Sequence, residues 1–202
     1  MTKVKICGVT NVPDALMAAA AGADAIGINF CAASPRCVPV DVAEAIATAL
    51  PAHVCRVGVF VDAPRDVVAA IAARVGLDAL QFHGSESPAL CAGWDRKTIK
   101  AVRVRDGETL ARAAAYAVDF ILADAYVEGR AGGTGQRVPA EWLVGVPADR
   151  LILAGGLTPD NVAEAIRAVR PAAVDVASGV EHALGRKDPE KVERFIANAR
   201  VA

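Results

Sequence analysis

The sequence predicts a single (β/α)8 barrel, or TIM barrel, in which residues 1–202 form one domain. A short β-branched run followed by an alanine-rich helical stretch recurs about every 25 residues, and it does so eight times. The units alternate strictly, and no Pro- or Ser-rich linker separates them. An open doubly wound sheet usually has fewer strands, so this pattern favours the barrel.

The eight predicted strands are short and mostly apolar on both faces, as parallel strands that are covered on both sides must be. In chain order they are VKICGV (4–9), DAIGINF (24–30), VCRVGVFV (54–61), LDALQFHG (77–84), TIKAVRV (98–104), DFILADA (119–125), RLILAGG (150–156) and AVDVASG (173–179).

Helix start signals lie between these strands. They are Asn11 before 12–21, Asp41 before 42–50, Pro64 before 65–75 and Thr158-Pro159-Asp160 before 161–169. Proline suits a helix N-terminus because it has no N–H to lose there. In the last predicted helix, 188–200, one face carries Val192, Phe195, Ile196 and Ala199. That spacing predicts an amphipathic helix lying against the core.

Composition and charge exclude several classes of protein. Apolar residues make up 54% of the chain and the net charge is −1, so neither nucleic acid nor an anionic membrane is an expected partner. The N-terminus has no apolar stretch of signal-peptide length, and no window reaches about 18 uninterrupted apolar residues. We therefore expect a cytoplasmic protein. The five cysteines form no CxxC pair, which predicts free thiols without a disulfide framework or a zinc site.

Polar residues at the ends of apolar strands are the candidates for chemistry, because active sites of barrels lie at the C-terminal ends of the strands. These residues are Cys7, Gln81, His83, Asp124 and Ser178, with Arg36 in the loop after the second strand. The longest irregular stretch, 126–139, follows the sixth strand. We expect it to be a mobile loop over the barrel mouth.

Cys7 shares one side of its strand with Lys3 and Lys5 through the two-residue period. A nearby cation would lower the thiol pKa, so a modest depression would make Cys7 a base or nucleophile near neutral pH. The alternative is a buried, inert thiol, which we assign to the other four cysteines.

Asp124 ends the apolar run FILA. Burying a carboxylate there costs free energy unless the group is paired or has a function. A role as general acid fits this position, and the alternative is a side chain that braces the following loop. His83 could orient a substrate or shuttle a proton, and its alternative role is that of a hydrogen-bonded structural imidazole.

Two glycine-rich turns, AGGLTPDN and ASGVE, follow the seventh and eighth predicted strands. Glycines let backbone N–H groups approach an anion closely, and the loops after these two strands of a barrel frequently hold phosphate. The candidate phosphate ligands are Gly155, Gly156, Ser178 and Gly179.

From about residue 3 to the last helix, the chain resembles the phosphoribosylanthranilate isomerase family of tryptophan biosynthesis. The resemblance rests on KICGVTN, FCAASPR, VGVFV, LQFHG, GGTG, LAGGLTPDNV and VDVASGVE, in this order and at barrel spacing. It implies an Amadori rearrangement of N-(5-phosphoribosyl)anthranilate to the 1-deoxyribulose 5-phosphate derivative, without metal or cofactor.

The resemblance also implies residue roles. Cys7 of KICG would be the general base at C2′ and Asp124 the general acid on the ring oxygen. Arg36 of SPR would contact the anthranilate side, where a guanidinium suits a carboxylate. Gln81 and His83 would line the pocket, and the glycine turns would hold the phosphate.

The sequence departs from the family pattern after GGTG, where Val138 occupies a position at which related sequences often have an aromatic residue. Another phosphosugar isomerase of the same barrel type and a non-catalytic phospholigand-binding barrel are the alternatives. Histidine-pathway isomerases would carry Asp at the first strand end, where this chain has Cys7. The expected partner is a small phosphosugar, and the chain is expected to be a monomer or homodimer.

Overall fold

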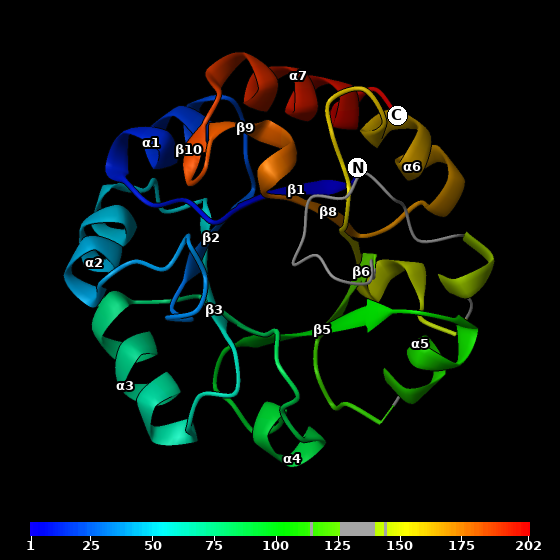
Figure 1. Cartoon of the computed structure of the whole chain (residues 1–202), viewed down its shortest axis with the longest axis horizontal. Coiled ribbons are helices and arrows are strands. Elements are labelled where there is room, and N and C mark those ends of the chain that lie inside the picture. The colour runs from blue at the N-terminus through cyan, green and yellow to red at the C-terminus, as the bar shows by residue number, and fades with distance from the viewer. Residues whose placement is uncertain (114, 126–139, 144) are drawn as a thin grey trace.

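Eight parallel strands form a closed barrel in which each strand pairs with the next and β8 pairs with β1 (Figure 1). This computed structural model describes residues 1–113, 115–125, 140–143 and 145–202. The strands are β1 (Lys3–Cys7), β2 (Ala25–Asn29), β3 (Cys55–Phe60), β4 (Ala79–Phe82), β5 (Lys97–Val104), β6 (Phe120–Ala125), β7 (Leu151–Leu153) and β8 (Ala173–Val176). The closed parallel barrel confirms the predicted fold class, and each strand overlaps its predicted segment.

The α-helices form a ring outside the strands (Figure 1). They are α1 (Val12–Ala20), α2 (Val40–Ala49), α3 (Arg65–Val75), α4 (Pro88–Cys91), α5 (Gly107–Ala113), α6 (Val162–Val169) and α7 (Pro189–Arg200), with short 3-10 helices η1 (Ala140–Leu143), η2 (Ala148–Arg150) and η3 (Ser178–Val180). Among the described residues, no helix is long and apolar enough to cross a membrane.

Of the four predicted helix starts, Asn11 and Pro64 are confirmed, since they directly precede α1 and α3, and the other two differ. Asn11 and Asp188 cap α1 and α7, since each side chain accepts a hydrogen bond from a first-turn N–H. The second helix begins at Val40, so Asp41 lies in its first turn and not before it. The sixth α-helix begins at Val162, because Asn161 is used in the turn itself, where its side chain accepts from the Thr158 N–H.

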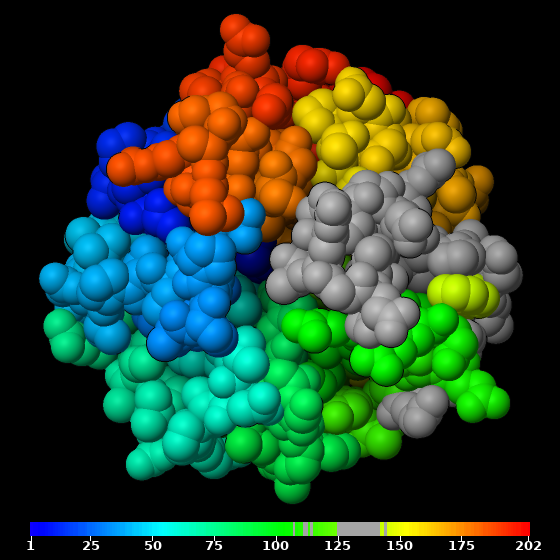
Figure 2. Space-filling model, in the orientation of Figure 1, coloured from blue at the N-terminus to red at the C-terminus, as the bar shows by residue number. Residues whose placement is uncertain are grey.

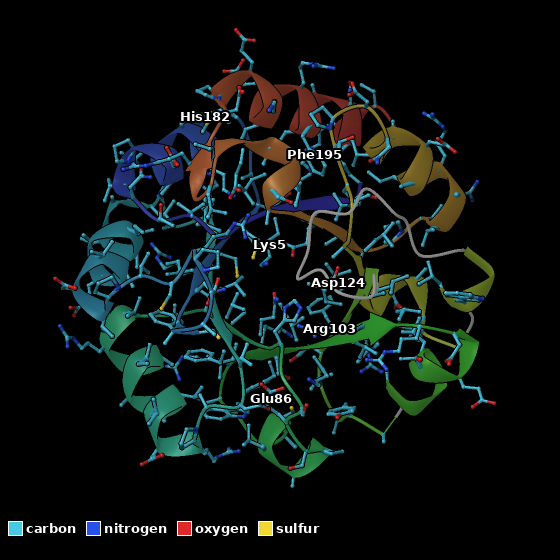
Figure 3. The ribbon with its side chains drawn as sticks, viewed as in Figure 1. Lys5, Glu86, Arg103, Asp124, His182 and Phe195 are labelled. Carbon is cyan, nitrogen blue, oxygen red and sulfur yellow. The ribbon has the colours of Figure 1, made fainter. Side chains whose placement is uncertain are left out.

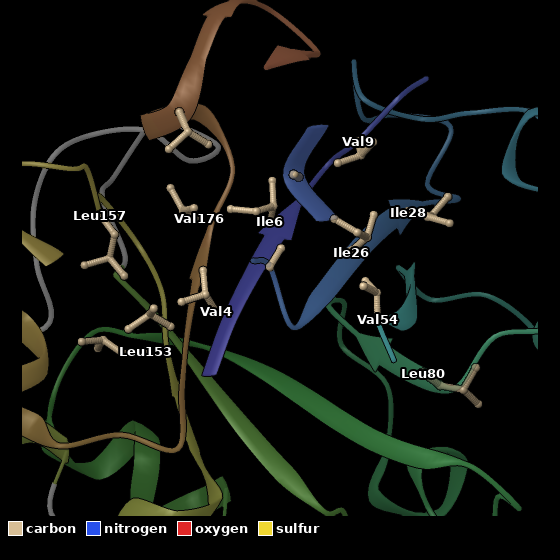
Figure 4. Close-up of a cluster of buried hydrophobic side chains, with 14 of the residues drawn as sticks. Val4, Ile6, Val9, Ile26, Ile28, Val54, Leu80, Leu153, Leu157 and Val176 are labelled. Carbon is tan, nitrogen blue, oxygen red and sulfur yellow. The ribbon is translucent and has the colours of Figure 1, made fainter. Parts of the chain in front are cut away.

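Two layers of apolar side chains follow from the two-residue period of the strands. Side chains that point outward from the strands pack under the helices, as Val4, Ile6, Ile26, Ile28 and Leu80 do (Figure 4). A second buried cluster fills the barrel interior and consists of Val57, Ala79, Ile99, Ala101, Leu122, Ile152 and Ala154. The interior cluster contains no side chain of β1, which leaves that strand's inward positions to polar groups.

A short antiparallel pair, β9 (Glu181–Ala183) and β10 (Arg186–Lys187), follows η3 and was not predicted from the sequence. It lies against the segments that follow β1 and β2, since Thr10 Oγ1 donates to Gly185 O over 2.6 Å. The pair therefore brings residues near the C-terminal end of the chain to the ends of the first two strands.

Candidate active site

The predicted site residues gather at the C-terminal ends of the strands. Cys7 is the last residue of β1, Gln81 lies in β4 with His83 just beyond it, and Asp124 is the penultimate residue of β6. Lys5 and Asp124 lie near the barrel axis (Figure 3). The segment 126–139, which was predicted to cover the mouth, lies outside the described residues.

The Cys7 thiol lies above a glycine and beside a buried ammonium. Cys7 and Gly27 are register partners on β1 and β2. A Cβ on Gly27 would come within 2.8 Å of Cys7 Sγ and 3.1 Å of Lys5 Nζ, so only glycine leaves room for both groups. Lys5 is 3% exposed, and its ammonium donates to Asp175 Oδ1 over 2.7 Å.

The expected depression of the Cys7 pKa is wrong for this structure. Burial raises the pKa of the thiol, and the Asp175 carboxylate raises it further. The positive charges of Lys5 and Lys187 act in the opposite direction but do not outweigh these effects. The sequence did predict the lysine correctly, but it contained no sign of the carboxylate that accompanies it.

Arg36 is brought next to Cys7 by the backbone of Gly8. A Cβ at Gly8 would overlap the Cδ atom of Arg36, so the arginine stem lies directly on this glycine. The guanidinium donates from Nε and Nη2 to the two carboxylate oxygens of Glu181, over 2.8 and 2.7 Å. This bidentate pair fixes the side chain, and among the residues that the structure describes it leaves the Nη1 edge for another acceptor.

Glu181 and Lys187 are members of the site that the sequence analysis missed. Lys187 Nζ donates to Glu181 Oε1 over 2.9 Å and to Ala177 O over 3.1 Å. Burial would raise the Glu181 pKa, but Arg36 and Lys187 outweigh it and lower that pKa. Glu181 directly follows the SGV turn of a motif already singled out, whereas no sequence signal distinguishes Lys187 from a surface lysine. Figure 2 shows the blue atoms of the β2–α2 connection against the orange β9–β10 pair, beside a hollow near the middle of this face.

A line of polar groups connects β4 to β6. The Gln81 Nε2 and His83 Nδ1 atoms are 3.0 Å apart, and His83 Nε2 lies 3.4 Å from Asp124 Oδ2. With this orientation of the amide, Nδ1 accepts, so the ring proton is on Nε2, the ring nitrogen that lies 3.4 Å from the Asp124 carboxyl. The fully buried Gln81 Oε1 has no hydrogen-bond partner within the described part of the chain. The structure therefore brings together the three residues predicted from LQFHG and DFILADA.

The two glycine turns also come together. Gly155 and Gly156 have φ values of 83° and 64°, a left-handed backbone that favours glycine at both positions. A Cβ on Gly179 would collide with the carbonyl oxygen of Leu157, so the turn after β8 is in contact with the turn after β7. Ser178 begins η3 and is exposed. All four predicted phosphate ligands thus lie in two adjoining turns.

A buried ion pair holds the segment that carries His83. Lys100 Nζ donates to Gly84 O over 2.7 Å and to Glu86 Oε2 over 2.8 Å. Glu86 in turn accepts from the N–H groups of Asp62 and Gly84. Glu86 and Lys100 are 4% and 3% exposed, so a buried ion pair holds the segment after β4 in place.

All five cysteines are free thiols, as predicted. Burial raises the pKa of Cys55 and of Cys91 to about 11 in each case. Within the described ranges, no group of three or more His, Cys, Asp or Glu side chains is arranged to hold a metal ion.

Residues 4–198 match the family model described as N-(5′-phosphoribosyl)anthranilate (PRA) isomerase. The N-(5′-phosphoribosyl)anthranilate isomerase of Citrifermentans bemidjiense is 52% identical over 201 residues, which cover 99% of this chain and 98% of the relative. That of Pseudomonas fluorescens Pf-5 is 53% identical, with coverage of 97% and 94%.

Solved structures give the same result. Phosphoribosyl anthranilate isomerase from Thermotoga maritima superposes with a TM-score of 0.93 at 40% identity, over 100% of both chains. Another structure of such an isomerase, in complex with reduced 1-(o-carboxyphenylamino)-1-deoxyribulose 5-phosphate, has a TM-score of 0.87 at 40% identity, also over 100% of both chains.

Proposed function

This chain belongs to the family of N-(5′-phosphoribosyl)anthranilate isomerases, and from that membership we propose how its own residues perform the reaction. The enzyme converts N-(5′-phosphoribosyl)anthranilate to 1-(2-carboxyphenylamino)-1-deoxyribulose 5-phosphate, a step of tryptophan biosynthesis. This is an internal exchange of oxidation state, because C2′ of the sugar is oxidised while C1′ is reduced. General acid–base chemistry suffices for it.

Asp124 acts as the general acid and Cys7 as the general base. The protonated Asp124 carboxyl gives its proton to the ribose ring oxygen, the C1′–O bond breaks, and a C1′=N iminium forms. The Cys7 thiolate then removes the C2′ proton, which yields an enolamine that tautomerises to the ketone. β7 and β8 separate β1 from β6 in the barrel, so the two groups approach the sugar from different sides.

His83 assists the acid through its position. Its Nε2–H faces Asp124 Oδ2 while Gln81 occupies Nδ1. The carboxylate that remains after Asp124 has donated its proton is thereby a hydrogen-bond acceptor for a neutral imidazole. His83 and Gln81 therefore act beside the sugar, in the step in which Asp124 donates its proton.

Two anion sites hold the ends of the substrate. The backbone N–H groups of the turns at Gly155, Gly156 and Gly179, with Ser178, bind the phosphate. The free edge of Arg36 binds the anthranilate carboxylate. Fixing both ends between acid and base makes the proton transfers effectively unimolecular.

The observation that carries these roles is the contact of Arg36 with Gly8. This contact puts Arg36, the proposed ligand of the anthranilate carboxylate, beside Gly8, which follows Cys7. Carboxylate recognition and proton abstraction therefore take place side by side. A non-catalytic phospholigand-binding barrel would need the glycine turns, but it would have no need of an arginine beside Cys7.

The test follows the loss of N-(5′-phosphoribosyl)anthranilate fluorescence, with the substrate generated in situ in metal-free buffer. Cys7→Ala and Asp124→Asn should each lower kcat by roughly 10²- to 10⁴-fold with little change in KM. Cys37→Ala, which removes a partly exposed thiol that is assigned no role, is the matched control and should keep the kcat of the parent enzyme. Near-normal kcat in either of the first two variants would refute the assigned role.

We also propose that residues 1–202 form one catalytic domain, that the enzyme is cytoplasmic, and that it is a monomer or homodimer without nucleic-acid or membrane partners. The net charge of −1 supports the absence of polyanionic partners. One related structure is described as generated monomers of the dimeric isomerase of Thermotoga maritima, so both assembly states are described for that relative. Size-exclusion chromatography with light scattering distinguishes them.

A further inference from the structure

The barrel interior contains an ion pair that the proposed reaction does not use. Lys5 on β1 and Asp175 on β8 are register partners, and Lys5 Nζ lies 2.7 Å from Asp175 Oδ1. Their side chains are 4% and 9% exposed. Removing both charges from water is costly, and apolar residues of similar volume often serve stability as well or better.

The pair lies directly below the proposed base. Lys5 and Cys7 project from the same side of β1, and both Lys5 Nζ and Cys7 Sγ lie over Gly27 of the neighbouring strand. The ammonium stays charged, because its attraction to Asp175 and Cys7 outweighs the effect of burial and holds the Lys5 pKa above its usual value. A permanent positive charge therefore lies beside the sulfur.

We propose that Lys5 is a positioning residue for Cys7, and that its ammonium, anchored by Asp175, provides the positive charge against which the Cys7 thiolate forms. This inference rests on the proposed function, in which that thiolate removes the C2′ proton. Lys5 acts through Cys7 and does not touch the substrate. The role of Asp175 is to hold the ammonium in place, and its negative charge raises the Cys7 pKa against the effect of that ammonium.

Four charged groups face the thiol from the elements around it. Lys5 and Lys187 favour the thiolate, and Asp175 disfavours it. Arg36, above Gly8, adds a further positive charge that interacts with the sulfur. Because Arg36 and Lys187 are both bound to Glu181, Lys5 and Asp175 are the pair whose opposite charges can be removed without disturbing the anthranilate site.

The experiment measures the pH dependence of Cys7 alkylation by iodoacetamide, resolved by peptide mass spectrometry, in the full-length enzyme without substrate. Only the thiolate reacts, so the midpoint of the rate reports its formation. Lys5→Met should move the midpoint upward by about one pH unit or more, and Asp175→Asn should move it downward. The kcat of Lys5→Met at neutral pH should fall about tenfold or more, with little change in KM.

Lys3→Met is the matched control, because Lys3 lies two residues earlier on the same strand but is exposed and paired with Asp24. It should leave the midpoint and kcat unchanged. If Lys5→Met does not fold, as shown by circular dichroism, Lys5→Met combined with Asp175→Asn is compared with Asp175→Asn alone, and the midpoint should again rise. An unchanged midpoint in a folded Lys5 variant would overturn the proposal. Because the alkylation is measured without turnover, a failure of Cys7 as the base would instead appear as normal kcat in Cys7→Ala.

Discussion

Arg36 depends for its position on a carboxylate that lies 145 residues further along the chain. Glu181 accepts two hydrogen bonds from the guanidinium and one from Lys187, so a single anion orients two cations. The arrangement aims the free edge of Arg36 and keeps the arginine side chain from sampling other rotamers. Substrate affinity should therefore depend on Glu181 although this residue is not proposed to bind substrate.

Replacing Glu181 by Gln should raise KM about tenfold or more and change kcat much less, because the charge that fixes Arg36 is lost while acid and base remain. Steady-state kinetics on the fluorescent substrate measures this split. Glu190→Gln, which removes an exposed carboxylate on α7, should leave both constants unchanged. A fall in kcat at constant KM would show that Glu181 acts on the chemistry instead.

At the residue scale, local sequence patterns predicted the residues whose signal is local. Cys7 and Asp124 are polar ends of apolar strands, so their location at the barrel mouth followed from periodicity and chain order. The partners that set their electrostatics could not be predicted in this way. Asp175 lies beside Lys5 only because β8 closes the barrel against β1, and a one-strand view of Lys5 gave the wrong direction for the Cys7 pKa.

At the element scale, the turns after β7 and β8 work as one unit. Gly179→Ala should weaken phosphate binding, because the new Cβ collides with the Leu157 carbonyl oxygen and must push the two turns apart. Since the colliding atom belongs to the backbone, a side-chain rotation cannot relieve the overlap. We expect KM to rise roughly tenfold or more and inorganic phosphate to lose its competitive inhibition in parallel. Unchanged inhibition by phosphate in a folded Gly179→Ala enzyme would place the anion elsewhere.

The connection after β4 should be sensitive to acid. Burial would raise the Glu86 pKa, but the Lys100 ammonium and backbone N–H groups outweigh it and lower that pKa. A carboxyl with a lowered folded-state pKa stabilises the fold above its unfolded value, near pH 4.3, and loses this contribution as the pH falls through the folded value. Glu86→Gln should therefore cost about 3–5 kcal/mol of unfolding free energy at pH 7, since it leaves Lys100 buried without its partner.

The difference between the parent and Glu86→Gln should begin to shrink below about pH 4.3, where the unfolded chain takes up the proton, and should disappear once the pH falls below the lowered folded-state pKa. Urea titrations at several pH values measure it. Glu44→Gln is the control, because Glu44 forms an exposed pair of 2.7 Å with Arg74, and exposed pairs contribute little to stability. A cost for Glu86→Gln that does not vary with pH would mean that packing, and not charge, holds this connection.

The helices and strands that the sequence predicted are apolar runs in the repeating strand–helix pattern or helices with an amphipathic face. All eight barrel strands and the amphipathic face of α7 belong to this group. The pair β9–β10, with the sequences EHA and RK, contains no apolar run and so gave no strand signal, although it carries Glu181 and Lys187. The start of α2 was misplaced because Pro39, not Asp41, occupies the position before the first helical turn.

For the whole molecule, closure of the ring joins the two ends of the chain. β8 pairs with β1, and Arg200 of α7 donates to Thr2 O, Gly22 O and Asp24 Oδ2. In Figure 1, α7 and α4 lie on opposite sides of the ring. If residues 1–202 form one domain, a destabilising substitution under α7 must also destabilise the region of α4, because no strand can separate without opening the barrel.

Phe195 provides the test, since it is a fully buried side chain of α7. Phe195→Ala should lower the unfolding free energy by about 3–5 kcal/mol. The reporter is Trp94, next to α4, whose ring lies 5.9 Å from that of Phe82; Trp142→Phe removes the other tryptophan signal in both proteins compared. Urea unfolding followed by Trp94 fluorescence and by far-ultraviolet circular dichroism should give coincident midpoints, and Phe195→Ala should shift both equally. A Trp94 transition that stays in place while the dichroism shifts would show that the α4 side unfolds independently and would divide the chain into two cooperative units.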